Sequence, residues 1–87
     1  MIPYGKQNIS EEDISVVVDV MRSDFLTQGQ KTPQFEEDIS VYCGSKYALA
    51  VNSATSALHI ACLALDLKKG DWLWTSPNTF VATANCG

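Results

Sequence analysis

The chain has 87 residues, of which 46% are hydrophobic, and its ten acidic and six basic side chains leave a net charge of −4. This balance argues against non-specific binding to nucleic acid and leaves no basic stripe for a membrane surface. No basic N-terminal region leads into an apolar stretch, and the longest apolar run, interrupted by His59, is too short to span a bilayer. We therefore expect a cytoplasmic, soluble protein whose partner is a small molecule.

The first predicted element is a helix that begins at Ser10 and ends near Ser23. The segment Ser10–Asp13 has the pattern of a capping box, with acidic residues in the first turn. Apolar residues then recur at helical spacing at Ile14, Val17, Val18 and Met21. The stretch Asp24–Lys31 has no periodicity and contains Gly29, so it is predicted to be a loop.

A second helix is predicted to open at Thr32-Pro33, with Pro33 at the first helical position, and to end at Gly44. A β-type run, Tyr47–Asn52, then leads into a helix over Thr55–Leu67.

A turn over Lys68–Asp71 and a second short strand, Trp72–Thr75, complete the expected elements. Loops at the carboxyl ends of neighbouring parallel strands converge on one crevice. We therefore expect Thr55 and Phe80 to face the same space.

The junction Val51–Leu58 is the strongest candidate for a binding site. A helix N-terminus has backbone N–H groups without intrahelical partners and the positive end of the helix dipole, so it suits a phosphate group. Thr55 and Ser56 add hydroxyl groups to those amides. The alternative is an ordinary strand–turn–helix junction, in which Ser53 or Thr55 only caps the helix.

The cysteines are Cys43, Cys62 and Cys86, an odd number at wide separations, which favours free thiols over a disulfide framework. His59 and Cys62 lie three residues apart on one helical face. Two such side chains without further ligands do not make a zinc site, so no metal centre is predicted.

Several ordered segments resemble the N-terminal motifs of one enzyme family. They are Ser23–Gly29, Phe35-Glu36, Asn52–Leu58, Gly70-Asp71 and Thr75–Asn85. Together they resemble the DegT/DnrJ/EryC1/StrS sugar aminotransferases, which depend on pyridoxal 5'-phosphate (PLP) and have fold type I. The resemblance covers nearly the whole chain. It implies an incomplete α/β fold: the N-terminal part of a large three-layer α/β/α domain with a mainly parallel sheet.

The resemblance also implies a division of the chain and a set of site residues. Residues 1–33 would form an N-terminal helix and substrate loop, and residues 34–87 would begin the PLP-binding large domain. The cofactor would be bound by four residues: Ala54, Thr55, Ser56 and Phe80, with Phe80 stacking on the pyridine ring. The substrate would be bound by six residues: Tyr4, Asp24, Phe25, Leu26, Thr27 and Ala54.

Within the family, the segments Ile2–Gln7 and Asn52–Leu58 are most similar to the corresponding segments of enzymes of pseudaminic acid biosynthesis. These aminate C4 of a UDP-linked 4-keto-6-deoxy-N-acetylhexosamine, with glutamate as the expected amino donor. Family resemblance further implies a homodimer. A PLP-dependent sugar dehydratase of the same family and a non-catalytic α/β fragment are the alternatives.

The catalytic lysine of such an enzyme must be desolvated or near positive charge, so that its amine is neutral enough to react. No lysine in the chain has a sequence context of this kind, so we expect the 87 residues alone to be inactive. The lysines are Lys6, Lys31, Lys46, Lys68 and Lys69.

Overall fold

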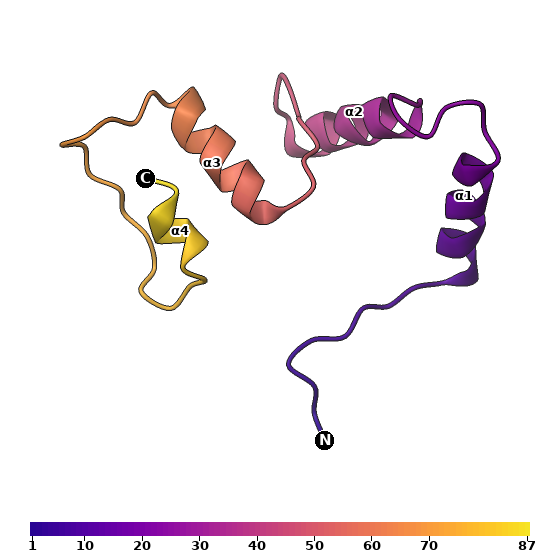
Figure 1. Ribbon diagram of the computed structural model, residues 1–87, viewed down its shortest axis with the longest axis horizontal. Coiled ribbons are helices and arrows are strands. Elements are labelled where there is room, and N and C mark those ends of the chain that lie inside the picture. The colour runs from indigo at the N-terminus through magenta and orange to yellow at the C-terminus, as the bar shows by residue number, and fades with distance from the viewer. The chain divides into compact units, whose positions relative to one another are not determined.

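The computed structural model describes residues 1–87 and contains four helices: α1 (Glu11–Met21), α2 (Lys31–Cys43), α3 (Ala54–Ala64) and α4 (Ala82–Asn85) (Figure 1). The chain divides into two compact units. The first, Met1–Ala48, contains α1 and α2. The second, Leu49–Gly87, contains α3 and α4, which contact each other.

The start of α1 has the expected capping box. The Ser10 hydroxyl accepts a hydrogen bond from the Asp13 N–H at 3.2 Å, and the Asp13 carboxylate accepts one from the Ser10 N–H at 2.8 Å. Because the bonds from the Ser10 backbone and side chain favour the charged carboxylate, the pKa of Asp13 lies below its usual value of 3.8. The helix ends at Met21 with Arg22 as its C-cap, close to the expected end.

Helix α2 begins earlier than expected and ends where expected. It starts at Lys31, so Pro33 is its third residue rather than its first. This is tolerated because the N–H groups of a first turn have no intrahelical acceptor, and proline has no N–H to lose. At the other end, Gly44 has a left-handed conformation with φ 66°. This geometry lets the Ser45 N–H reach the Ser40 carbonyl at 2.9 Å, in the pattern of a Schellman motif.

Helix α3 is shorter than expected, because the chain leaves the helical conformation at Asp66. Asp66 has φ 55°, in the left-handed region that usually holds glycine. The Leu67 N–H then bonds to the Cys62 carbonyl at 3.2 Å, and the Asp66 N–H bonds to the Leu63 carbonyl at 3.0 Å. These two bonds form a second Schellman motif, which ends the helix before Leu67.

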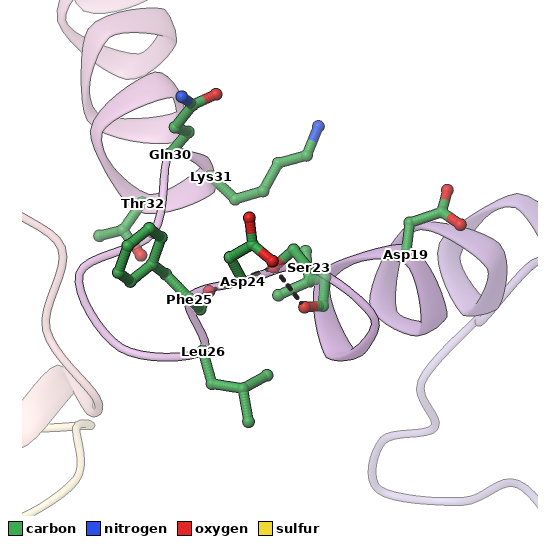
Figure 2. A pocket seen from close by; sticks show the side chains of 10 residues that line it. Asp19, Ser23, Asp24, Phe25, Leu26, Gln30, Lys31 and Thr32 are labelled. Carbon is green, nitrogen blue, oxygen red and sulfur yellow. Dashed lines mark hydrogen bonds between the residues drawn. The ribbon is translucent and has the colours of Figure 1, made fainter.

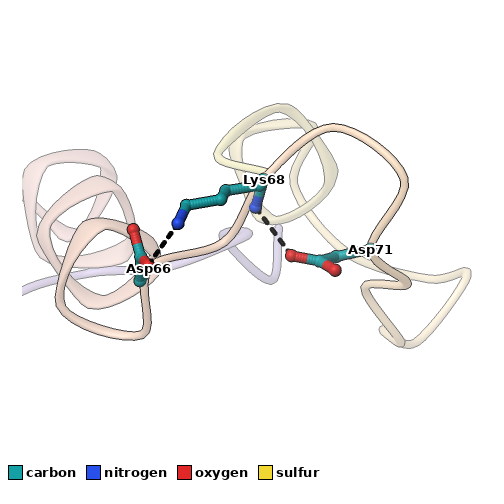
Figure 3. Close-up of polar contacts among 3 residues, drawn as sticks. All are labelled: Asp66, Lys68 and Asp71. Atoms are coloured by element: carbon teal, nitrogen blue, oxygen red, sulfur yellow. Dashed lines mark hydrogen bonds and ion pairs between the residues drawn. The ribbon is translucent and has the colours of Figure 1, made fainter.

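The expected turn after α3 is present and is closed by polar contacts (Figure 3). The Lys68 N–H donates to the Asp71 carboxylate at 2.7 Å, and the Asp71 N–H donates to the Lys68 carbonyl at 3.0 Å. The Lys68 ammonium group also pairs with Asp66 at 2.6 Å. Gly70 lies within this turn with φ 103°, a conformation that other residues rarely adopt.

The two expected strands, at residues 47–52 and 72–75, are not strands in the structure. A strand exists only as part of a hydrogen-bonded ladder, and neither segment belongs to such a ladder. The mixed α/β fold is therefore not seen in these 87 residues, which form a helical structure with extended connections. The family-level expectation of a parallel sheet remains a prediction.

Neither unit has an extensive core. Ala82 in α4, with 8% of its surface exposed, is the one buried hydrophobic residue. Trp72 and Trp74 are 87% and 90% exposed, and Leu63 on α3 is 66% exposed. A compact chain of this length would bury about 60% of its unfolded surface. The apolar side chains of both units therefore lack covering surface within the chain.

Candidate functional site

The N-terminus of α3 is organised by hydrogen bonds among three polar side chains. The Ser53 hydroxyl accepts from the Ser56 N–H at 3.1 Å and lies 3.0 Å from the Ser56 hydroxyl. The Ser56 hydroxyl donates to the Asn52 side-chain oxygen at 3.2 Å. Because Ser56 has one hydroxyl hydrogen and gives it to Asn52, the Ser53 hydroxyl is the donor in their mutual contact. Ser53 is thus the N-cap of the helix.

This network leaves hydrogen-bond donors of two adjacent residues, Ala54 and Thr55, without an acceptor. The N–H groups of Ala54 and Thr55 have no acceptor, as expected for the first positions of a helix, and the Thr55 hydroxyl makes no hydrogen bond. Both residues are exposed. Three donors are therefore available to an anion at the positive end of α3, and they suit a phosphate group. The Ser56 N–H and hydroxyl are already used within the turn.

Phe80 lies in the segment before α4, in the same unit as α3, and its side chain is 74% exposed. No ring contact or hydrogen bond joins it to the start of α3. Its face is open to stack on a planar ring. The shared space expected for the two residues therefore stays a prediction.

The predicted substrate loop lines a cavity of about 410 Å³ in the first unit (Figure 2). Asp24, Phe25 and Leu26 contribute to its wall, whereas Thr27 belongs to the same loop but does not line the cavity. The lining residues are Asp19, Val20, Ser23, Asp24, Phe25, Leu26, Gly29, Gln30, Lys31 and Thr32.

The cavity is shaped by the close return of the loop upon itself. A Cβ atom added to Gly29 would lie 2.9 Å from the Phe25 carbonyl oxygen, which is closer than real Cβ contacts. Ser23 holds the start of the loop, because its hydroxyl contacts the Val20 carbonyl at 2.6 Å and the Phe25 carbonyl at 3.2 Å. Gly29 therefore allows a loop that a larger residue would open.

The sequence did not single out Lys31 as a site residue, but the structure places it in the cavity wall. It is the first residue of α2, and it makes no ion pair with the carboxylates of Asp19 and Asp24 that line the same cavity. The feature of the sequence that could have indicated Lys31 is its position directly after the predicted substrate loop. Lys31 supplies the positive charge of a wall that otherwise carries two carboxylates.

Tyr4 lies outside the cavity. It is in the irregular segment before α1, with its side chain fully exposed. The structure therefore brings together three of the predicted substrate residues and leaves Tyr4 apart from them. Ala54, which was predicted for both ligands, is in the second unit, at the start of α3.

The helices are all too short or too polar to cross a bilayer. No group of three metal-ligating side chains occurs, and His59 and Cys62 gather no further ligand.

Comparison with known proteins identifies the family. Residues 7–86 match the DegT/DnrJ/EryC1/StrS aminotransferase family, so the chain belongs to that family. This agrees with the resemblance seen in its motifs. Members of the family depend on PLP. No solved structure matches the chain.

Several curated proteins are similar over almost the whole chain. A UDP-4-amino-4,6-dideoxy-N-acetyl-beta-L-altrosamine transaminase of Campylobacter jejuni is 47% identical over 85 residues, which is 98% of this chain and 22% of that protein. An uncharacterized protein of Methanocaldococcus jannaschii is 44% identical, and the spore coat polysaccharide biosynthesis protein SpsC of Bacillus subtilis is 42% identical. Both alignments cover 97% of this chain and 22% of the relative. The chain thus spans about a fifth of the length of the relatives that it matches.

Proposed function

We propose that this chain is the cofactor-phosphate and substrate-loop segment of a PLP-dependent sugar aminotransferase. The observation that carries the proposal is the set of free donors on Ala54 and Thr55 at the start of α3. They belong to the segment that the family resemblance assigns to the cofactor phosphate. The 47% identity to a UDP-sugar transaminase supports the same reading.

The residues of α3 would bind the phosphate and fix the position of the cofactor. Charge-assisted hydrogen bonds contribute about 1.5–3 kcal/mol each, compared with about 0.3–1 kcal/mol for a helix dipole, so the direct donors dominate. Phe80 would restrain the plane of the ring by stacking. When bound, PLP supplies the electron sink that allows an amino group to be moved between substrates.

For the substrate, we propose a UDP-linked 4-keto-6-deoxy-N-acetylhexosamine that is aminated at C4, with glutamate as the amino donor. The loop Asp24–Thr27 and Tyr4 would contact this nucleotide sugar. Lys31 lies in the wall of the cavity that this loop lines, and it would provide a positive charge for the diphosphate. The functional form would be a homodimer.

All five lysines of the chain are exposed to solvent. None has the desolvated environment that a reactive lysine needs. We therefore propose that the reactive lysine and the acidic partner of the pyridine nitrogen belong to the longer protein, and that the 87 residues alone have no transaminase activity.

The proposal is tested by assaying the intact protein with PLP, glutamate and the UDP-linked keto sugar. We expect 2-oxoglutarate and a 4-amino sugar to form in equal amounts. A deoxygenated sugar formed without consumption of glutamate would instead identify the dehydratase. Absence of both products, together with no binding of PLP, would favour a non-catalytic fragment in which Ser53 only caps α3.

A further inference from the structure

Two thiols from neighbouring helices lie in contact within the unit Leu49–Gly87. The Sγ atoms of Cys62, on α3, and Cys86, at the end of α4, are 3.5 Å apart. The Cys62 thiol donates to Cys86, and the Cys86 thiol donates to the Thr83 carbonyl at 3.2 Å. The remaining cysteine, Cys43, is exposed and belongs to the other unit.

The surroundings hold Cys86 against α3. Both thiol residues are half-buried, unlike Cys43. A Cβ atom added to the adjacent Gly87 would lie 2.8 Å from a Leu73 methyl carbon and 3.3 Å from one of Leu67. The backbone beside Cys86 therefore packs closely on apolar side chains, and this packing keeps the two sulfur atoms together.

The separation is short enough for a bond to form by side-chain movement. The sulfur atoms must approach from 3.5 Å to a bond length of about 2.05 Å. Rotation of a cysteine side chain about its Cα–Cβ bond moves its sulfur atom, so we expect the side chains to supply this remaining approach.

From this geometry we propose that Cys62 and Cys86 form a redox-responsive pair that closes to an intramolecular disulfide in the presence of a small-molecule disulfide. One cysteine, as thiolate, attacks the small disulfide, forms a mixed disulfide and releases one small thiolate. The second cysteine then attacks the protein sulfur, so that the Cys62–Cys86 bond forms and a second small thiolate leaves. The two cysteine protons pass to the two released thiolates, and the small disulfide takes up both electrons.

The bond would join α3 to α4. If the proposed function holds, it would tie the helix that begins with the phosphate-binding residues to the segment that follows Phe80. The proposal for the thiol pair depends only on the Cys62–Cys86 contact, so it can be tested without the cofactor.

The hydrogen bond to Cys86 raises the pKa of the Cys62 thiol above its usual value of 9.0, because the bond favours the protonated thiol. The thiolate is the nucleophile in thiol–disulfide exchange, so we expect disulfide formation to accelerate as the pH is raised from 7 toward 9.

The test is to incubate the intact protein with oxidised glutathione, block the remaining thiols and digest with trypsin. Cleavage after Lys31, Lys46 and Lys68 or Lys69 places each cysteine in a different peptide. We expect the peptide that contains Cys62 to be linked to the peptide that begins at Gly70 and contains Cys86. The linked pair would be lighter by about 2 Da than the two reduced peptides together.

Three variants and one condition serve as controls. Cys62→Ser and Cys86→Ser are expected to abolish the link, and Cys43→Ser to leave it unchanged. In urea, the preference for Cys62–Cys86 over pairs with Cys43 should disappear. The proposal is overturned if the folded protein shows mixed disulfides with glutathione but no internal link, or links Cys43 as often as the other two. Since PLP binding is measured separately on the same samples, failure of the link and failure of the proposed function are distinguishable.

Discussion

Thr55 carries two hydrogen-bond donors that no group of the chain accepts, its backbone N–H and its hydroxyl. Its neighbour Ser56 has the same kinds of group, but both are engaged with Ser53 and Asn52. The sequence placed these residues correctly at the start of a helix because small hydroxyl residues favour such positions. The sequence could not show which donors form hydrogen bonds within the turn and which stay available to a ligand. This depends on which hydroxyl side chains come within hydrogen-bonding distance of one another.

The first prediction follows from this difference. Thr55→Val removes the free hydroxyl with little change in side-chain shape. Loss of a charge-assisted bond of about 1.5–3 kcal/mol corresponds to PLP affinity weaker by about 10- to 140-fold. The dissociation constant is measured by titration of the intact protein. Thr75→Val, the same chemical change at a hydroxyl whose one contact is a 3.4 Å approach to the Ser76 carbonyl, is the matched control and should leave the affinity unchanged. Equal affinities for wild-type and Thr55→Val would contradict this role of the hydroxyl.

A second prediction concerns the pH dependence of α1. The pKa of Asp13 is lowered in the folded state by its bonds to Ser10, so the charged carboxylate stabilises the helix start. Its contribution is fully present above 3.8, the usual value, and is lost as the pH falls through the lower folded pKa. Protection from amide exchange at the start of α1, taken relative to the intrinsic exchange rate at each pH, should therefore fall on acidification below 3.8. In Asp13→Asn this acid-induced change should be smaller, and an unchanged pH profile would show that the carboxylate is not involved.

At the scale of the elements, helix ends were predicted better than strands. Gly44 and the Ser10 capping box are local signals, and the structure contains both. The end of α3 was misplaced because Asp66, rather than a glycine, adopts the left-handed conformation. The strands at residues 47–52 and 72–75 require hydrogen-bonding partners far along the chain, and the pattern of side chains within each segment does not supply them.

A third prediction tests the end of α2. Gly44→Ala adds a methyl group that meets no atom within 4 Å, so its effect comes from the left-handed backbone alone. We expect loss of about 1 kcal/mol of stability, concentrated in the last turn of the helix. Gly5→Ala is the matched control, because Gly5 also has open space around it but no positive φ. Hydrogen exchange at Ser40 to Ser45 is the measurement, and equal rates in the two variants would contradict the argument.

For the molecule as a whole, the missing core is the dominant feature. Large apolar side chains such as Trp72, Trp74 and Phe80 are exposed, while Ala82 is buried. The chain spans 22% of the length of the Campylobacter jejuni relative. The sequence alone could not show which faces of these elements lie open. Of the predicted site residues, Asp24, Phe25 and Leu26 line one cavity and Tyr4 lies outside it, while the grouping of Phe80 with Thr55 stays a prediction.

The fourth prediction compares the 87 residues with the intact protein. In the chain alone, Trp72 and Trp74 should emit at the wavelength of tryptophan in water, and denaturant should shift this emission little and without a cooperative transition. In the intact protein the emission should lie at shorter wavelength and unfold cooperatively. Cooperative unfolding of the chain alone, from a short-wavelength emission, would show that it covers its own apolar side chains.

The most direct test is hydrogen exchange of the intact protein with and without saturating PLP, read in the peptide that contains the start of α3. If Ala54 and Thr55 bind the cofactor phosphate, exchange at their amides should slow markedly on addition of PLP, while exchange in α1 should change little. PLP that binds the protein and slows exchange elsewhere, but leaves the amides of Ala54 and Thr55 as fast as before, would contradict the assignment.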